Sequence, residues 1–86
     1  MTSVNERLDD IYDEFDRLMR AGTLAQIDKI MLSTDVEKES MDILLGILTA
    51  SLPVKSKLQA RHEFFQKVQA RLVSLGGTDS GLRGLE

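Results

Sequence analysis

The sequence predicts an all-α fold of four helices packed as two antiparallel helical hairpins. Apolar residues recur at helical spacing along most of the 86-residue chain. Residues that end helices separate these stretches at Gly22, Pro53 and Gly76. A chain of this length builds one small core, so we expect a single helical domain over residues 1–75 and a disordered tail over residues 76–86.

The first helix is expected over about residues 4–21. Ser3 and Glu6 have the spacing of a capping box, which satisfies the free amide donors of a first turn. Gly22 is a typical helix terminator. The apolar residues lie three and four positions apart, at Val4, Leu8, Ile11, Phe15 and Leu18. This spacing places them on one stripe, which predicts the face that packs into the core.

A short second helix is expected over about residues 24–32, where Thr23 and Gln26 offer another capping box. Its apolar face comprises Leu24, Ile27, Ile30 and Met31. The Ser-Thr-Asp sequence at residues 33–35 should end this helix, because these side chains compete for backbone hydrogen bonds.

The third helix begins between Asp35 and Met41, with either Thr34 or Ser40 as its cap, and its body runs to Leu52. It is apolar nearly all round, so we expect either the central core helix or one half of a homodimer interface. Gly46 lowers helix stability by up to about 1 kcal/mol relative to alanine. A close approach of a neighbouring helix would explain the glycine.

The fourth helix is expected over about residues 58–75, after a loop at residues 51–57 that contains Pro53. Its stripe comprises Leu58, Phe65, Val68, Leu72 and Leu75. Residues 76–86, GGTDSGLRGLE, contain four glycines and no helical spacing. Such a segment buries too little apolar surface to offset the entropy of ordering, hence the expected tail.

One stretch of the chain resembles a known class of helical hairpin. Residues 11–31, IYDEFDRLMRAGTLAQIDKIM, resemble one tetratricopeptide or pentatricopeptide hairpin. The resembling residues are Tyr12, Phe15, the Ala21-Gly22 turn, Leu24 and Ile27. The second hairpin departs from the pattern, and two hairpins are fewer than the three repeats such solenoids need. Those families bind peptides or single-stranded RNA, so the resemblance implies a helical interaction module.

A second resemblance concerns residues 44–61, LLGILTASLPVKSKLQAR, which look like small uncharacterised bacterial or phage helical proteins. That resemblance implies a microbial setting and no particular activity.

The net charge of −3 is divided unevenly along the chain. Residues 1–42 hold 11 acids and 5 bases, a net −6, whereas residues 43–86 hold 3 acids and 6 bases, a net +3. The candidate partner-binding residues are the bases of residues 53–71: Lys55, Lys57, Arg61, Lys67 and Arg71. They form either a solvated face that complements the acidic first helix, or a surface for an acidic protein or for nucleic-acid phosphates.

Few residues in the sequence are suited to catalysis or to metal binding. The chain has no cysteine and one histidine, His62, which we expect on the fourth helix at the boundary between core and solvent. The carboxylates of the first helix, such as Asp9 and Asp13, lack calcium-loop spacing and are expected to be a solvated face. No glycine-rich phosphate loop occurs. We therefore expect no enzymatic activity, no metal and no cofactor.

The sequence favours a non-enzymatic protein–protein interaction module, a small cytoplasmic adaptor, accessory or regulatory protein. Its partner would be another protein or a second copy of the chain. A nucleic-acid-associated regulator that uses residues 53–71 is one alternative, and a structural homo-oligomer subunit is another. We expect neither a membrane partner nor a small-molecule substrate.

Overall fold

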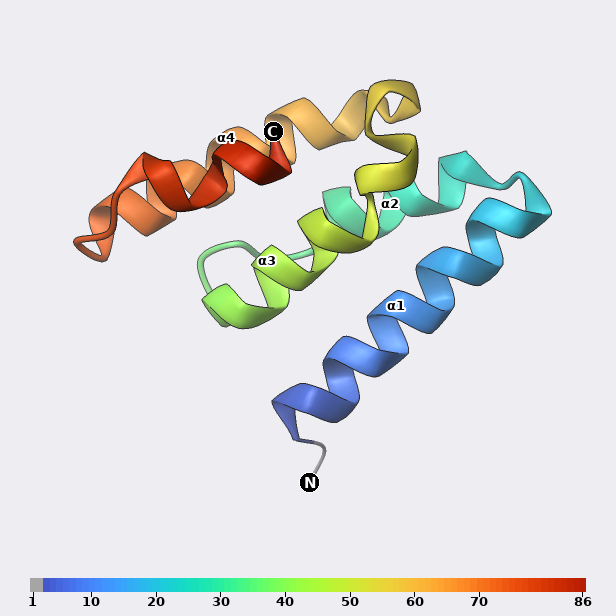
Figure 1. Cartoon of the computed structure of the whole chain (residues 1–86), viewed down its shortest axis with the longest axis horizontal. Helices are drawn as coiled ribbons and strands as arrows, with labels where there is room; N and C mark the ends of the chain where they lie inside the picture. The colour runs from blue at the N-terminus through green and yellow to red at the C-terminus, as the bar shows by residue number, and fades with distance from the viewer. Residues whose placement is uncertain (1–2) are drawn as a thin grey trace.

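The described residues fold into four α-helices and two 3₁₀ segments, which confirms the predicted all-α class (Figure 1). The structure is a computed structural model that describes residues 3–86, without the side chains of residues 79–81. Its elements in chain order are α1 (Val4–Ala21), α2 (Leu24–Ser33), α3 (Met41–Ala50), η1 (Leu52–Lys57), α4 (Gln59–Ser74) and η2 (Asp79–Leu85).

The ends of α1 follow from the residues that flank it. The Ser3 hydroxyl accepts a hydrogen bond from the backbone N–H of Glu6 at 3.2 Å, as the capping-box spacing predicts. At the other end, Gly22 adopts a left-handed conformation with φ 74°, and its N–H donates to the carbonyls of Leu18 and Met19. Glycine takes this conformation without steric penalty, so the helix stops where the sequence predicts.

The caps of α2 and α3 differ from each other. The predicted capping box at Thr23 is wrong, because its hydroxyl instead donates to the Leu18 carbonyl at 3.2 Å, and α2 has no side-chain cap. Of the two caps offered for α3, Ser40 is the one used, and it accepts from the Ile43 N–H at 3.3 Å.

The predicted loop at residues 51–57 is mostly helical. The third helix ends at Ala50, two residues before the predicted end, and η1 continues the chain as 3₁₀ turns with Pro53 near its start. The missing N–H of proline is tolerated in a first turn. Downstream, α4 ends at Ser74, so Leu75 lies beyond the helix and is 61% exposed, although the stripe predicted it to be buried.

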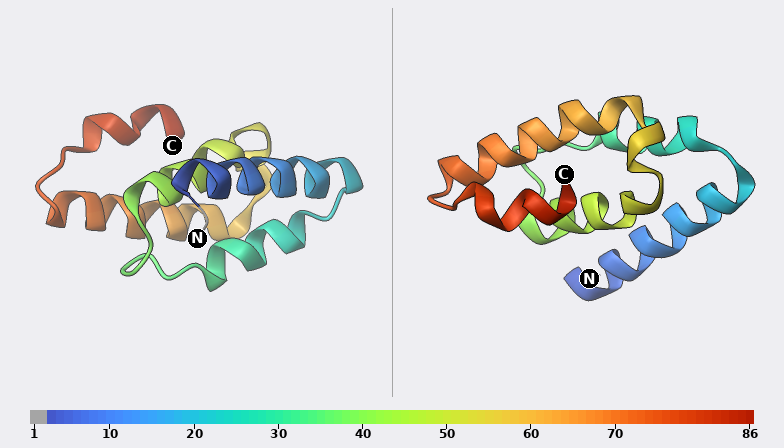
Figure 2. Two further views of the ribbon diagram at one scale, coloured as in Figure 1. Left: turned by 90° about the horizontal axis from the view of Figure 1, so that it is seen from below. Right: turned by 45° about the horizontal axis from the view of Figure 1, so that its top comes forward.

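Helices that alternate in the sequence make the largest contacts. Figure 2 shows α1 lying along α3, and α2 packs correspondingly on α4. The consecutive pairs, α1 with α2 and α3 with α4, also touch, but less extensively. The two expected hairpins are therefore joined by cross-packing into one body with a shared core.

The third helix is the centre of this core. Six of its ten residues are buried within the single chain, so its apolar excess has partners in the same molecule. The close approach expected at Gly46 is confirmed, because a Cβ atom there would overlap the Leu8 side chain of α1. None of the described helices combines the length and apolarity needed to cross a membrane.

Two polar contacts join the acidic first half of the chain to the basic second half. The Asp28 carboxylate of α2 accepts from the Ala60 N–H at 3.3 Å, in the first turn of α4. Leu58, the N-cap residue of α4, has no side-chain oxygen, so Asp28 supplies the capping contact in its place. The Arg71 guanidinium donates to the Val36 carbonyl at 2.6 Å, between α2 and α3. In each contact a charged side chain of one half meets a backbone group of the other, so neither contact is an ion pair between the halves.

The segment after α4 turns back alongside that helix (Figure 2). Gly76 adopts a left-handed conformation with φ 87°, and η2 follows. Leu82 is 1% exposed and packs in the core, with Leu85 partly buried beside it. The predicted disorder of residues 76–86 stays a prediction, and the side chains of residues 79–81 lie outside the described part.

Candidate partner-binding groove

The five bases of residues 53–71 do not form one exposed patch. Lys55 and Lys57 are exposed on η1. Lys67 is exposed on α4 and forms an i,i+4 ion pair with Glu63 at 3.2 Å. Arg71 is half-buried and is held by the Val36 carbonyl. Arg61 is buried and points inward, so the structure removes it from the exposed set and leaves Lys55 and Lys57 as the unengaged bases among the five.

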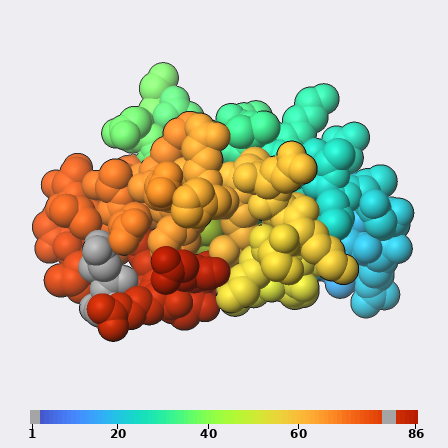
Figure 3. Space-filling model, turned by 90° about the horizontal axis from the view of Figure 1, so that it is seen from above, coloured from blue at the N-terminus to red at the C-terminus, as the bar shows by residue number. Residues whose placement is uncertain are grey.

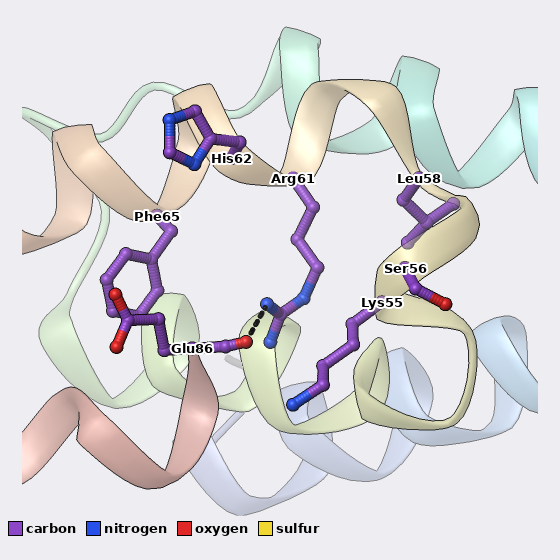
Figure 4. A pocket seen from close by; sticks show the side chains of 7 residues that line it. All are labelled: Lys55, Ser56, Leu58, Arg61, His62, Phe65 and Glu86. Carbon is purple, nitrogen blue, oxygen red and sulfur yellow. Dashed lines mark hydrogen bonds between the residues drawn. The ribbon is translucent and has the colours of Figure 1, made fainter.

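The Arg61 side chain joins three parts of the chain. Its Nε donates to the Ser51 hydroxyl at 2.6 Å, and its Nη2 donates to the Leu48 carbonyl at 3.3 Å, both at the C-terminal end of α3. Nη2 also donates to the carbonyl of Leu85. Nη1 donates to the carbonyl of Glu86 at 3.2 Å, the contact drawn in Figure 4. One side chain therefore binds the end of α3 and the end of η2 together.

The charge of Arg61 is compensated in an unusual way. The side chain is 5% exposed, and no carboxylate pairs with it among the side chains that the structure describes. Its acceptors are instead the Ser51 hydroxyl and carbonyls at two helix C-termini, which carry partial negative charge. Burial lowers the pKa of the Arg61 guanidinium. The group nevertheless stays protonated at neutral pH, because arginine begins from a very high pKa.

A pocket of about 400 Å³ opens beside Arg61, between η1, α4 and the end of η2 (Figure 4). Its lining residues are Lys55, Ser56, Leu58, Arg61, His62, Phe65 and Glu86. Figure 3 shows these three elements meeting on one face of the molecule. We call this pocket and its rim the η1–α4 groove.

The η1–α4 groove combines an apolar base with a cationic side. Leu58 and Phe65 are buried at 6% and 7% exposure and form its apolar part. Lys55 extends from η1 toward the Arg61 guanidinium, while the exposed His62 lies at the opposite rim (Figure 4). The combination suits a ligand that offers both apolar side chains and carbonyl or carboxylate oxygens.

The acidic face of α1 is a separate surface. The i,i+4 spacing predicts the pairs Asp16–Arg20 and Asp13–Arg17. The first is present at 3.0 Å, whereas Arg17 pairs instead with Glu14 at 2.7 Å. No group of carboxylates or histidines suited to holding a metal ion is present in the part of the chain that the structure describes. The arginines thus neutralise part of this face locally.

The sequence did contain a signal for the burial of Arg61. Position 61 completes the three-and-four spacing of Leu58, Phe65 and Val68, so it belongs to the buried stripe of α4. The prediction instead placed Arg61 among the bases of a charged face. The acceptors from residues 85 and 86 carry no comparable signal, because they are backbone atoms of a segment distant in sequence.

Comparisons with protein-family models, with curated proteins and with solved structures found no match to this chain. The resemblances to helical-repeat hairpins and to small bacterial or phage proteins therefore stay predictions.

Proposed function

We propose that the protein is a non-enzymatic protein–protein interaction module, a small adaptor or regulatory protein that binds an acidic partner at the η1–α4 groove. One observation carries this proposal. The groove already holds a peptide segment, because Arg61 binds the backbone carbonyls of Leu85 and Glu86 while Leu82 is buried nearby. A surface that holds one segment in this way has the chemistry to hold another.

The unengaged lysines support an acidic partner. Lys55 lines the groove and Lys57 lies two residues away on the same 3₁₀ segment, and both are exposed. Exposed charges at the rim of an interface accelerate association and select partners by charge. The apolar base of Leu58 and Phe65 would then supply contact area.

Binding accounts for the histidine better than catalysis does. His62 is exposed at the rim, and none of the described residues forms a hydrogen bond with its ring. A histidine that acts as a general base is normally oriented by such a bond. We therefore assign His62 to the rim of the groove.

The dispersal of the five bases favours a protein partner over nucleic acid. Phosphate binding draws on several exposed cations that act together. With Arg61 buried and Arg71 and Lys67 engaged, Lys55 and Lys57 provide a small footprint. The oligomer alternative loses its main support, because most of the apolar residues of α3 are buried inside one chain.

A charge-reversal experiment tests the proposal. The double variant Lys55→Glu/Lys57→Glu is compared with Lys29→Glu/Lys38→Glu, which makes the same charge change at exposed positions away from the groove. Immobilised chains are incubated with an extract of the source cells. We expect wild type and control to retain an acidic protein that the groove variant loses. Equal retention by both variants would place the contact elsewhere.

A mobility-shift titration with duplex and single-stranded DNA and RNA tests the nucleic-acid alternative. Electrostatic binding is strongest at low salt, so about 50 mM salt is the informative condition. A shifted band that Lys55→Glu/Lys57→Glu abolishes would favour that alternative over the protein partner. If the nucleic acid is not shifted at this salt concentration, the nucleic-acid alternative is wrong.

A further inference from the structure

We propose that the η1–α4 groove, together with the slot that Leu82 fills, is a docking site for a short helical peptide of another protein. The peptide would carry two leucines three residues apart, followed by acidic residues. Residues 82–86 are then the intramolecular occupant that this partner displaces. The inference rests on the proposed function and specifies the chemistry of its partner.

The present occupant defines the apolar part of the pattern. Leu82 is 1% exposed, and Leu85 is partly buried against the same core. In 3₁₀ geometry, residues three apart lie on the same side of the helix, so both leucines of η2 face the body of the protein. Arg83 and Gly84, which lie between them, are exposed. A competing segment therefore needs the two leucines and tolerates other residues between them.

The polar part of the recognition uses backbone atoms. Arg61 donates to the Leu85 and Glu86 carbonyls and forms no ion pair with a described side chain of the segment. Carbonyls at the end of any helical turn attract a cation in the same way. Arg61 can therefore bind the end of a foreign helical turn as it binds the end of η2.

The attachment of the occupant makes its release feasible. Gly76 and Gly77 join it to α4, and Gly76 has a positive φ of 87°. The only buried side chain described beyond this turn is Leu82. Because two glycines join the segment to α4 and Leu82 is the side chain that anchors its described part in the core, we expect it to open at a lower free-energy cost than the rest of the core.

An acidic partner has an advantage over the protein's own tail, and this argues against a second copy. A tethered segment of this kind acts at a local concentration in the millimolar range, about 1 mM or above. An identical tail from a second copy gains nothing over it. Glu86, the residue after Leu85, lines the groove with Lys55 but forms no ion pair with Lys55 or Lys57. A partner whose acidic side chains reach these two lysines therefore gains contacts that the described part of the tail lacks.

Peptide titration into the full-length protein tests the inference. The probe is the labelled peptide of residues 78–86, and binding is followed by fluorescence anisotropy. Replacing Leu82→Asp in the chain should release its own tail, because the segment loses the free energy of burying one leucine side chain. The probe should then bind this variant about ten- to a hundredfold more tightly than wild type. The control variant Arg83→Ala, at an exposed tail position, should behave as wild type.

Variation of the probe tests the pattern without altering the protein. The same peptide with Leu82→Asp should not bind. The native peptide extended by two glutamates should bind more tightly than the native peptide, and Lys55→Glu/Lys57→Glu should abolish that gain. If the Leu82→Asp chain fails to fold by circular dichroism, wild type titrated with these three peptides at up to about 1 mM decides the question.

Three results would overturn the inference. One is equal binding of the native and Leu82→Asp peptides. Another is no binding of the native peptide to a folded Leu82→Asp chain. A third is a wild-type dimer in sedimentation that the tail substitution dissolves, which would make a second copy the occupant. Retention of an acidic protein through Lys55 and Lys57 would still support the proposed function, so the two can fail separately.

Discussion

Leu8 of α1 occupies the space beside Gly46 of α3 in which a Cβ atom would have to lie. Replacing Gly46→Ala gains up to about 1 kcal/mol of helix propensity. The added methyl group also displaces the Leu8 side chain, which is partly buried against the core, and overpacking of this kind costs about 1–3 kcal/mol. We expect a net loss of about 1 kcal/mol in the free energy of unfolding, measured by urea denaturation.

The Leu8→Ala background is the control for this prediction. Removing the larger side chain should relieve the overlap, so Gly46→Ala should be neutral or stabilising there. An equal loss in both backgrounds would show that another contact opposes the methyl group.

Asp28 should act as the cap of α4, although it belongs to α2. Asp28→Ala removes the acceptor of the Ala60 N–H and should lower the free energy of unfolding by about 1 kcal/mol. Asp28→Asn keeps an acceptor oxygen and should lose less. Asp13→Ala, an exposed carboxylate on α1, is the matched control and should have little effect. Equal effects of Asp28→Ala and Asp28→Asn would mean that charge rather than capping matters.

The Arg7–Glu39 pair should make stability depend on acidic pH. The hydrogen bond from Arg7, at 2.7 Å, lowers the pKa of the Glu39 carboxyl despite its partial burial. This carboxyl therefore stabilises the fold above the ordinary glutamate pKa of about 4.3. That contribution is lost as the pH falls through the lower pKa of the folded state.

Thermal unfolding across this pH range provides the measurement. Glu39→Gln should be less stable than wild type at neutral pH, and the difference should shrink as the pH falls below about 4. Glu37→Gln, at an exposed neighbouring carboxylate, should track wild type throughout. A difference between Glu39→Gln and wild type that does not change with pH would contradict the assignment.

Local features of the fold could be predicted from the sequence because neighbouring residues determine them. The bounds of α1 follow from Ser3 and Gly22, and the cost of Gly46 pointed to a close helix contact. The predicted capping box at Thr23 was wrong because its hydroxyl can either accept from the helix that follows or donate to the helix before it. In the structure it donates to the Leu18 carbonyl.

The candidate site was less predictable because it is built from distant segments. The bases at Lys55 and Lys57 were found, but Arg61 was grouped with them instead of with the buried stripe. Its partners are Ser51 and backbone carbonyls, including two at residues 85 and 86, which carry no side-chain signal. Only the packing of α3, α4 and η2 brings them together.

The alternating contacts of the helices have a consequence for how the chain folds. Each of the two largest contacts, α1 with α3 and α2 with α4, joins one helix from either side of the loop at residues 34–40. A cut in that loop gives one fragment with α1 and α2 and another with α3 and α4, so neither fragment contains both helices of either large contact. Isolated helices of this length are marginally stable in water. The chain should therefore fold as one cooperative unit, and two such fragments should become structured only by complementing each other.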